Sequence, residues 1–267
     1  MKVLIFGQSG AGKTTLCEGI EWIMGDRVVH INADQMRHEA DDWDFSEQGR
    51  WRQFRRMLNK ANAVSDSGKI ALVDFICPYK SAREQFDADL TIFMSTVVKS
   101  KYEDTNQVFE WPEWTEYDFD IHEWEDDNAT DVCWAIGNKI WEDELPTVQM
   151  LGRWQPWHEG HEALLERCME KAPQVQVQIR TMMWGENNPF AVQEVYANLR
   201  EKLARLAGIV DIKIVPNIVN ITYGRKVGYT IEQEHFDKEI EDISATQIRK
   251  DSKSVSYTHL RAHETGY

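Results

Sequence analysis

Cysteine is scarce in this 267-residue sequence, and its spacing disfavours the usual cysteine-based scaffolds. The four cysteines, Cys17, Cys77, Cys133 and Cys168, lie far apart and form no CxxC pair. A structural zinc site built on paired cysteines and a disulfide framework are therefore both disfavoured. The pattern fits a reducing compartment, and we expect a cytoplasmic protein.

Long apolar runs are also absent. A membrane-spanning helix needs about 20 consecutive apolar residues, and no run in the chain approaches that length. The first residues lead directly into a predicted strand, so no signal peptide is expected. We therefore predict that the protein has no membrane partner.

Positive charge is in deficit. The chain has 30 Lys and Arg against 45 Asp and Glu, a formal net charge of −15, which disfavours nucleic acid as a general partner. Residues 1–146 carry a net charge of −14, whereas residues 147–267 carry −1. This asymmetry predicts two domains, one over residues 1–146 and another that starts at residue 147.

The strongest signal that is present is a glycine-rich stretch at residues 7–15. It follows the apolar run 3–6, a predicted strand, and precedes residues 16–23, which have helical spacing. This is the setting of a phosphate-binding loop, in which backbone N–H groups and the helix N-terminus attract an anion. We expect Lys13 to reach the β- and γ-phosphates of ATP and Thr14 to bind Mg²⁺. The expected ATP-binding residues are Gly7, Ser9, Gly10, Ala11, Gly12, Lys13, Thr14 and Thr15.

Further strands are predicted at residues 27–34, 70–76 and 90–94, and a helix capped by Ser46 is predicted to run to about Ala63. Ligands bind at the carboxyl ends of parallel strands, so Asp34 and Arg37 are placed to meet a substrate. The predicted helix carries a cluster of four arginines. This cluster is either a solvated face with acidic partners or an anion-binding face. Its members are Arg50, Arg52, Arg55 and Arg56.

About the first 145 residues resemble adenylylsulfate (APS) kinase, which phosphorylates the 3′-hydroxyl of adenosine 5′-phosphosulfate with ATP. The similar segments are the loop at 7–14, residues 32–37, residues 44–56 and residues 76–80. The resemblance implies a P-loop NTPase kinase with a parallel α/β sheet. It implies that Lys13 and Asp34 are catalytic, with Asp34 near the attacking hydroxyl.

The same resemblance implies that Arg37 and Arg50 hold the phosphosulfate and that Phe45 stacks on the adenine. The expected substrate-binding residues of this domain are Arg37, Phe45, Arg50, Gln53, Ile76, Cys77 and Pro78. The chain departs from the family pattern at Asn32, Ala33, Gln53 and Cys77. These departures leave the acceptor open.

Residues 147–250 resemble the nucleotidylyltransferase superfamily, in the version typical of archaeal-type nicotinamide-mononucleotide (NMN) adenylyltransferases. Residues 152–161 are similar to its His-x-Gly-His signature, residues 243–249 to its Ile-Ser-x-Thr-x-Ile-Arg signature, and residues 188–190 to an Asn-Pro-Phe segment of the NMN enzymes. The resemblance implies a second parallel α/β domain, Rossmann-like, that releases pyrophosphate from ATP or CTP with Mg²⁺.

The residue types in the second domain suit that chemistry, because positioned N–H donors stabilise charge on phosphate oxygens. His158, His161 and Arg249 are the expected catalytic residues, Ser244 and Thr246 are expected to bind phosphates at a helix N-terminus, and Arg153 is expected to bind substrate. The two histidines could instead be metal ligands or ordinary turn residues, although the sequence offers no evident third ligand nearby.

The two resemblances together imply a bifunctional enzyme, a transferase of phosphorus-containing groups that acts on small-molecule nucleotides. An alternative is a salvage pair of nicotinamide riboside kinase and NMN adenylyltransferase, and another is a nucleotide-sensing binding protein. The sequence leaves open whether the chain forms a homodimer.

The last residues of the chain continue none of these patterns. Residues 254–267 are similar to a peptide produced when sequencing-adapter DNA is translated, and we interpret them as a non-native tail. The second domain is therefore predicted to span residues 147–253.

Overall fold

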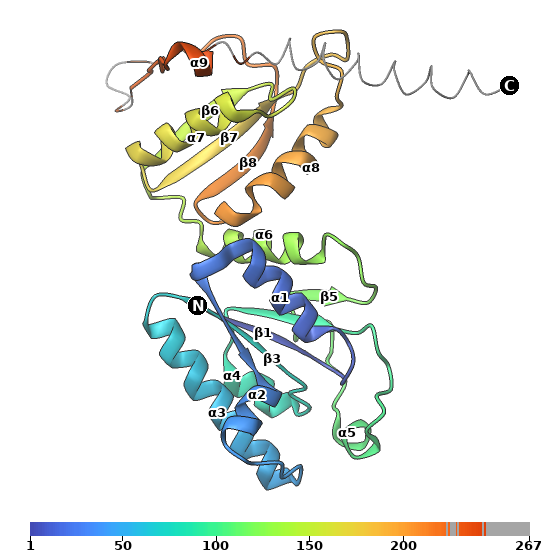
Figure 1. Ribbon diagram of the computed structural model, residues 1–267. Coiled ribbons are helices and arrows are strands. Elements are labelled where there is room, and N and C mark those ends of the chain that lie inside the picture. Colours follow the sequence, from blue (N-terminus) through green and yellow to red (C-terminus); the bar gives the residue numbers. More distant parts are fainter. Residues whose placement is uncertain (223, 225–227, 229, 242, 244–267) are drawn as a thin grey trace, which may run out of the picture. The chain divides into compact units, whose positions relative to one another are not determined.

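The computed structural model describes all residues except 223, 225–227, 229, 242 and 244–267 (Figure 1). Its chain divides into two compact units. The first is Met1–Ile140 with Ala204–Ala207, and the second is Trp141–Leu203 with Gly208–Tyr267. The predicted tail at 254–267 lies outside the described residues, and so do Ser244, Thr246 and Arg249.

The first unit is built on a five-stranded parallel sheet in the order β2-β3-β1-β4-β5 (Figure 1). The strands β1, β3 and β4 are nearly continuous apolar runs, as is typical of parallel strands covered on both faces. The bounds are β1 Lys2–Gly7, β2 Val28–Asn32, β3 Ile70–Phe75, β4 Leu90–Met94 and β5 Phe119–Ile121.

Alternate residues of the central strand β1 enter two different cores. Val3 and Ile5 pack with residues of helices α1 and α6, whereas Leu4 and Phe6 pack with residues of α3 and α4. Helices therefore cover both faces of the sheet. The helices of this unit are α1 Lys13–Met24, η1 Gly25–Arg27, α2 Ala33–Glu39, α3 Glu47–Asp66, α4 Lys80–Phe86, α5 Glu103–Val108 and α6 Asn128–Ile140.

The second unit contains a three-stranded parallel sheet in the order β6-β7-β8, with strands Thr147–Gly152, Gln174–Arg180 and Val210–Val215. Its helices are α7 Glu159–Lys171, α8 Val192–Leu203 and the short α9 Lys238–Glu241, and η2 Ala204–Leu206 follows α8. Parallel strands joined through helices in both units confirm the predicted α/β class. The identity of this second sheet as a nucleotidylyltransferase domain stays a prediction.

Two local predictions concern the start of α3 and the end of β2. Ser46 caps α3 as predicted, because its side chain accepts a hydrogen bond from the Gly49 N–H at 3.2 Å. The predicted strand over 27–34 is too long, since β2 ends at Asn32, whose side chain caps α2 by accepting from the Gln35 N–H at 2.9 Å. Asp34 therefore lies in the first turn of a helix rather than in a strand.

None of the helices in the described part of the chain combines the length and the apolar character needed to cross a bilayer.

Candidate functional site

The loop between β1 and α1 depends on glycine at two positions. A Cβ at Gly7 would lie 2.4 Å from the Met94 carbonyl oxygen of the neighbouring strand β4, so no larger residue fits there. Gly12 caps α1 with φ at +91°, in the left-handed region that glycine adopts without strain. These two glycines let the chain turn tightly from the sheet into the N-terminus of α1.

The side chain of Lys13 lies along this loop. Its Nζ donates hydrogen bonds to the carbonyl oxygens of Gly7 at 3.1 Å and Gln8 at 2.8 Å. Burial lowers the pKa of Lys13 to about 8, against the opposing effect of the Asp74 and Asp34 carboxylates. The loop therefore holds a desolvated ammonium group close to two carboxylates.

Thr14 faces a buried carboxylate that the sequence analysis did not select. Its hydroxyl donates to Asp74 Oδ2 at 2.7 Å, and the Asn32 amide donates to Asp74 Oδ1 at 3.0 Å. Burial acts to raise the pKa of Asp74, but contacts with His30, Thr14 and Asn32 outweigh it and leave the pKa below its ordinary value. A hydroxyl beside an ionised carboxylate is the donor set with which phosphate-loop enzymes hold Mg²⁺.

A cavity of about 730 Å³ opens from the loop across the carboxyl ends of the strands. It is lined by most of the residues predicted for the first domain, and Asn32, Asp74, Tyr102 and Asp104 also line it. The predicted residues on its wall are Ser9, Gly10, Gly12, Lys13, Thr14, Thr15, Asp34, Arg37, Phe45, Arg50, Gln53, Ile76, Cys77 and Pro78.

Gly7 and Ala11, two predicted ATP-binding residues that do not line the cavity, support the backbone of the loop. Gly7 allows the close approach to β4, and the buried Ala11 accepts a hydrogen bond on its carbonyl oxygen from the Thr96 hydroxyl at 2.8 Å. Their part in the site is to hold the backbone that faces the cavity.

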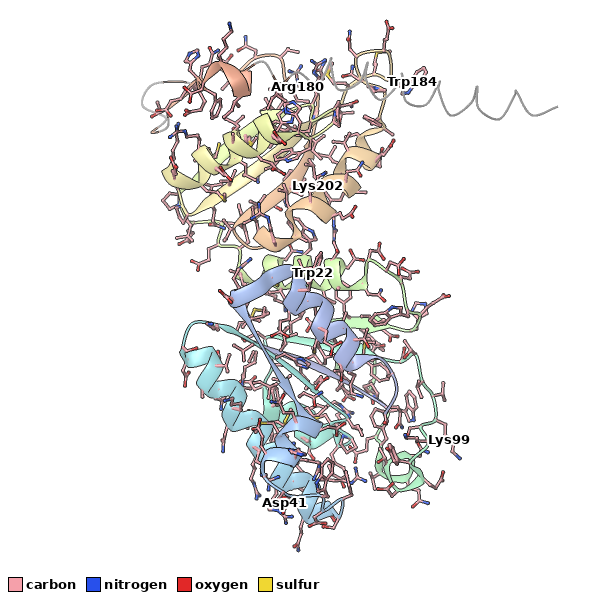
Figure 2. The ribbon with its side chains drawn as sticks, viewed as in Figure 1. Trp22, Asp41, Lys99, Arg180, Trp184 and Lys202 are labelled. Atoms are coloured by element: carbon pink, nitrogen blue, oxygen red, sulfur yellow. The ribbon has the colours of Figure 1, made fainter. Side chains whose placement is uncertain are left out.

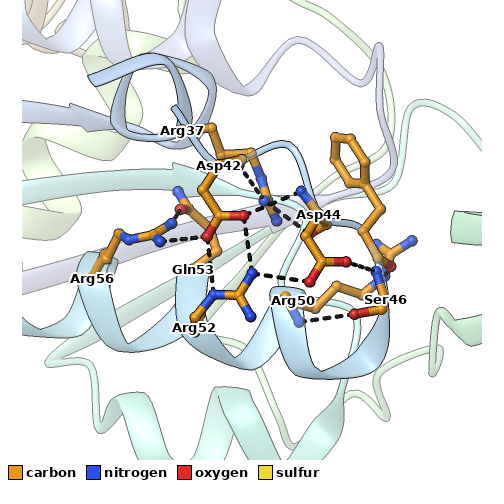
Figure 3. Close-up of polar contacts among 10 residues, drawn as sticks. Arg37, Asp42, Asp44, Ser46, Arg50, Arg52, Gln53 and Arg56 are labelled. Atoms are coloured by element: carbon orange, nitrogen blue, oxygen red, sulfur yellow. Dashed lines mark hydrogen bonds and ion pairs between the residues drawn. The ribbon is translucent and has the colours of Figure 1, made fainter. Parts of the chain in front are cut away.

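An aromatic ring with two guanidinium groups near it forms another part of the cavity wall. The Arg37 guanidinium lies 4.6 Å from the Phe45 ring centroid, and that of Arg50 lies 5.9 Å from it. The buried Arg37 donates to the backbone carbonyl oxygens of Asp42 and Asp44 (Figure 3). Arg50 donates to the carboxylate of Asp104 at 2.7 Å. This wall can stack a flat ring and attract an anion at once.

Three of the four arginines clustered on α3 divide into two groups. Arg52 and Arg56 form ion pairs with Asp42, and Arg52 also pairs with Asp44 (Figure 3). The hydrogen bonds from Arg52 and Arg56 hold the pKa of Asp42 far below its usual range. These two arginines therefore match the interpretation of a face with acidic partners, whereas Arg50 reaches the cavity.

The turn after β3 is held by a residue that the sequence analysis missed. Cys77 is buried with φ at +43°, and Arg83 donates to the carbonyl oxygens of Cys77 at 3.1 Å and Pro78 at 3.3 Å. Arg83 also forms a 3.0 Å ion pair with Glu116. Gln53 plays a similar part on α3, where it donates to the Ala33 carbonyl oxygen at 3.0 Å.

In the second unit, two stacked imidazoles lie at the start of α7. The ring centroids of His158 and His161 are 3.7 Å apart, and the Nδ1 atoms of both rings are buried without a hydrogen-bond partner among the described residues. Burial and, to a smaller extent, His158 lower the pKa of His161 to about 3, and burial also lowers the pKa of His158. Both rings are therefore neutral at pH 7, and each carries one N–H donor.

The segment 152–161 lies against the segment 188–190, which the sequence had singled out separately. Arg153 donates to the Asn188 side-chain oxygen at 3.4 Å. The Gln155 amide donates to the Phe190 carbonyl oxygen at 3.1 Å and accepts from the Phe190 N–H at 3.2 Å. The structure thus joins the two segments at the carboxyl end of β6.

The neighbouring strands add polar groups to the same edge of this sheet. Arg180 ends β7 and donates to the side-chain oxygen of Asn217, which follows β8, at 2.7 Å. Figure 2 shows Arg180 and also Trp184, whose side chain is exposed in the segment between β7 and α8. The carboxyl edge of the second sheet therefore carries arginine, histidine and amide groups, whereas the predicted Ser244, Thr246 and Arg249 lie outside the described residues.

Comparison with known proteins identifies relatives of the first unit. Residues 1–107 match the family model of adenylylsulphate kinase. A probable adenylyl-sulfate kinase of Archaeoglobus fulgidus is 33% identical over 96 residues, which are 34% of this chain and 62% of that protein. An adenylyl-sulfate kinase of Vibrio cholerae is 37% identical over 82 residues, 29% of this chain and 38% of that protein.

A solved structure, the Mycobacterium tuberculosis APS kinase CysC in complex with AMPPNP and APS, has 20% identity and a TM-score of 0.42, and covers 49% of this chain and 94% of that one. The chain spans 62% or less of the length of the two curated relatives. Residues 1–107 are thus a domain similar to adenylylsulphate kinase, with a nucleotide-binding P-loop.

Proposed function

We propose that the first unit is an ATP-dependent kinase that phosphorylates a hydroxyl group of a nucleotide, with adenylylsulfate as the first candidate acceptor. The observation that carries the proposal is a single cavity that joins Lys13 and Thr14 of the phosphate loop to Asp34, Arg37 and Phe45. A donor site and an acceptor site in one cavity are what a direct phosphoryl transfer requires.

Each of these side chains has a part in such a transfer. The enzyme does little covalent chemistry in phosphoryl transfer, so it acts by position and charge. The Lys13 ammonium stabilises negative charge on the β- and γ-phosphates, and the Asp34 carboxylate accepts the proton of the attacking hydroxyl. Thr14 and Asp74 would hold Mg²⁺, which supplies the positive charge that balances the phosphates when it is bound.

The wall made by Arg37, Phe45 and Arg50 favours an acceptor that has both a flat base and an anionic group. The ring of Phe45 stacks on the base, while the two guanidinium groups beside it attract the anion. This combination supports adenylylsulfate over nicotinamide riboside, because the riboside is a cation without a phosphate or sulfate group. Nicotinamide riboside remains the acceptor of the alternative salvage function.

Mass spectrometry of the products formed by the purified chain from ATP, Mg²⁺ and each acceptor in turn tests this proposal. We expect a phosphorylated acceptor together with ADP. We expect Asp34→Asn to lower turnover by about 10²–10⁴-fold, the range for removal of a general base. Asp41→Asn, a change of an exposed acid that does not line the cavity, should leave turnover unchanged.

Two outcomes would count against the kinase proposal. ATP binding without turnover of any acceptor would instead favour a nucleotide-sensing protein. Equal activity in Asp34→Asn and Asp41→Asn would remove Asp34 from the mechanism.

We propose a second activity for the second unit, transfer of a nucleotidyl group with release of pyrophosphate. The neutral, half-buried imidazoles of His158 and His161 support it, because their N–H groups are positioned donors for phosphate oxygens. An acceptor phosphate such as that of NMN would attack the α-phosphate of ATP or CTP, and pyrophosphate would leave. Pyrophosphate release from each triphosphate with NMN tests this activity, and its absence with both would reject it.

A further inference from the structure

Three buried side chains of different chemistry meet beside the phosphate loop. Cys17 of α1, His30 of β2 and Asp74 of β3 bring a sulfur, a ring nitrogen and a carboxylate oxygen within 4.8 Å of one another. Cys17 is fully buried, and the side chains of His30 and Asp74 are 12% and 2% exposed. Within the described part of the chain, this is the one group of three histidine, cysteine or acidic side chains that meets this distance.

The fold explains why the three side chains converge. Leu72 packs in the same core cluster as Cys17. Asp74 stands two residues further along β3, so its side chain projects from the same face of the sheet as that of Leu72. His30 is paired with Leu72 in the register of β2 and β3, which brings the imidazole to this face as well. The convergence therefore follows from strand alternation under α1.

The imidazole of His30 provides a second observation. Its Nε2 is buried and makes no well-formed hydrogen bond to the described residues, and its contact there is an ion pair with Asp74 Oδ2 at 3.4 Å. This contact is longer than a normal hydrogen bond, so it only partly compensates for the burial of Nε2. A ligand that accepts a lone pair from Nε2 and contacts the carboxylate would satisfy this atom.

We propose that Cys17, His30 and Asp74 form a binding site for Zn²⁺. Thiolate, imidazole and carboxylate are the three ligand types of protein-bound zinc, whereas a thiolate and an imidazole do not suit Mg²⁺ or Ca²⁺. As zinc binds, the Cys17 thiol releases its proton to solvent. The thiolate and the carboxylate then balance the two positive charges, so the occupied buried site is electrically neutral.

The coordination geometry requires only a small adjustment. Ligand atoms of tetrahedral zinc, at about 2.0–2.3 Å from the metal, lie about 3.5 Å from one another. The three atoms here are at most 4.8 Å apart, so side-chain rotation of about 1 Å brings them together. A water molecule or the Thr14 hydroxyl, 2.7 Å from Asp74 Oδ2, is available for the fourth position.

Zinc at this site would inhibit the phosphate loop. Asp74 is the residue that Thr14 contacts, so a carboxylate bound to zinc is withdrawn from the position in which it would serve Mg²⁺. This consequence rests on the proposed kinase function, but binding of the metal does not.

Titration of the full, reduced chain with Co²⁺ tests the site, because a cobalt–thiolate bond gives a charge-transfer absorption in the near ultraviolet. Cobalt bound only to His158 and His161 gives no such absorption. We expect this absorption in the natural chain, its loss on addition of Zn²⁺, and its absence in Cys17→Ala and His30→Gln. Cys133→Ser is the matched control, because Cys133 is buried in the same core cluster outside the group of three. This variant should keep the absorption.

A second readout separates metal binding from catalysis. Where the chain phosphorylates an acceptor, Zn²⁺ should inhibit turnover in the natural chain, while Cys17→Ala should keep its turnover and lose the inhibition. If no acceptor is turned over, the cobalt spectrum still decides the site. Absence of the thiolate absorption from the natural chain, or its survival in both Cys17→Ala and His30→Gln, would overturn the proposal.

Discussion

At the scale of single residues, Asp74 shows which features of a site can be predicted from the sequence and which cannot. It is the one charged residue of the apolar strand Ile70–Phe75, and an acid in such a strand is a signal for a site at the strand end. The sequence does not say which face of the sheet the carboxylate takes or that Thr14 and Asn32 donate to it. The role of Arg83 cannot be predicted from the sequence either. Its acceptors, the carbonyl oxygens of Cys77 and Pro78, are brought to it by the conformation of the turn after β3.

Lys13 gives a prediction about stability and pH. Its pKa is about 8 in the folded chain because of burial and 10.5 when it is unperturbed. The unfolded chain therefore binds more protons between these values, so the cost of burying the charge is full below pH 8 and disappears as the pH approaches 10.5. Lys13→Met should raise the free energy of unfolding at pH 7 by at most about 3 kcal/mol. Loss of the two hydrogen bonds of Lys13 reduces this gain.

Urea unfolding of the natural chain and the variant at pH 7 and pH 10 measures this effect. The stability difference between the two proteins should shrink at the higher pH. Lys60→Met, a change of an exposed lysine on α3, should give the same small difference at both values. A Lys13→Met difference that is independent of pH would contradict the assigned cause.

At the scale of secondary-structure elements, local chemistry made some elements predictable and others not. The strands β1, β3 and β4 and the start of α3 follow from apolar runs and from Ser46 as a cap. By contrast, residues 103–131 contain twelve acids and no Lys or Arg, and only their alternating stretch 117–122 predicts a strand, which the structure has as β5. Their contribution to the cavity, through Asp104 and Thr105, is set by tertiary packing and not by local sequence.

The cap of α3 gives a prediction at this scale. Ser46→Ala removes the acceptor of the Gly49 N–H and leaves that group of the first turn without its partner. We expect a loss of about 1 kcal/mol in the free energy of unfolding, measured by urea denaturation. Ser81→Ala, at an exposed position in the first turn of α4, should change it by less than about 0.5 kcal/mol. Equal effects of the two variants would show that the cap does not stabilise the helix.

At the scale of the whole molecule, the charge asymmetry of the sequence predicts two units. The first unit comprises Met1–Ile140 with Ala204–Ala207, and the domain boundary at residue 146 stays a prediction. The sequence also predicts a phosphate-binding segment at residues 243–249 of the second domain. Its residues Ser244, Thr246 and Arg249 lie outside the described residues.

Two units with separate phosphate-binding groups predict separable activities. Lys13→Ala removes the positive charge of the loop in the first unit, and His161→Ala removes an imidazole donor in the second. Loss of one positioned donor typically lowers turnover by about 10²–10³-fold. Because the two residues lie in different units, their effects should not couple. Lys13→Ala should therefore suppress ADP formation and spare pyrophosphate release, and His161→Ala should do the reverse.

Separate assays of ADP and pyrophosphate in both variants measure this, with His122→Ala, at an exposed histidine after β5, as the control. If either variant silences both products, one composite site performs the chemistry and the proposal of two enzymes is wrong.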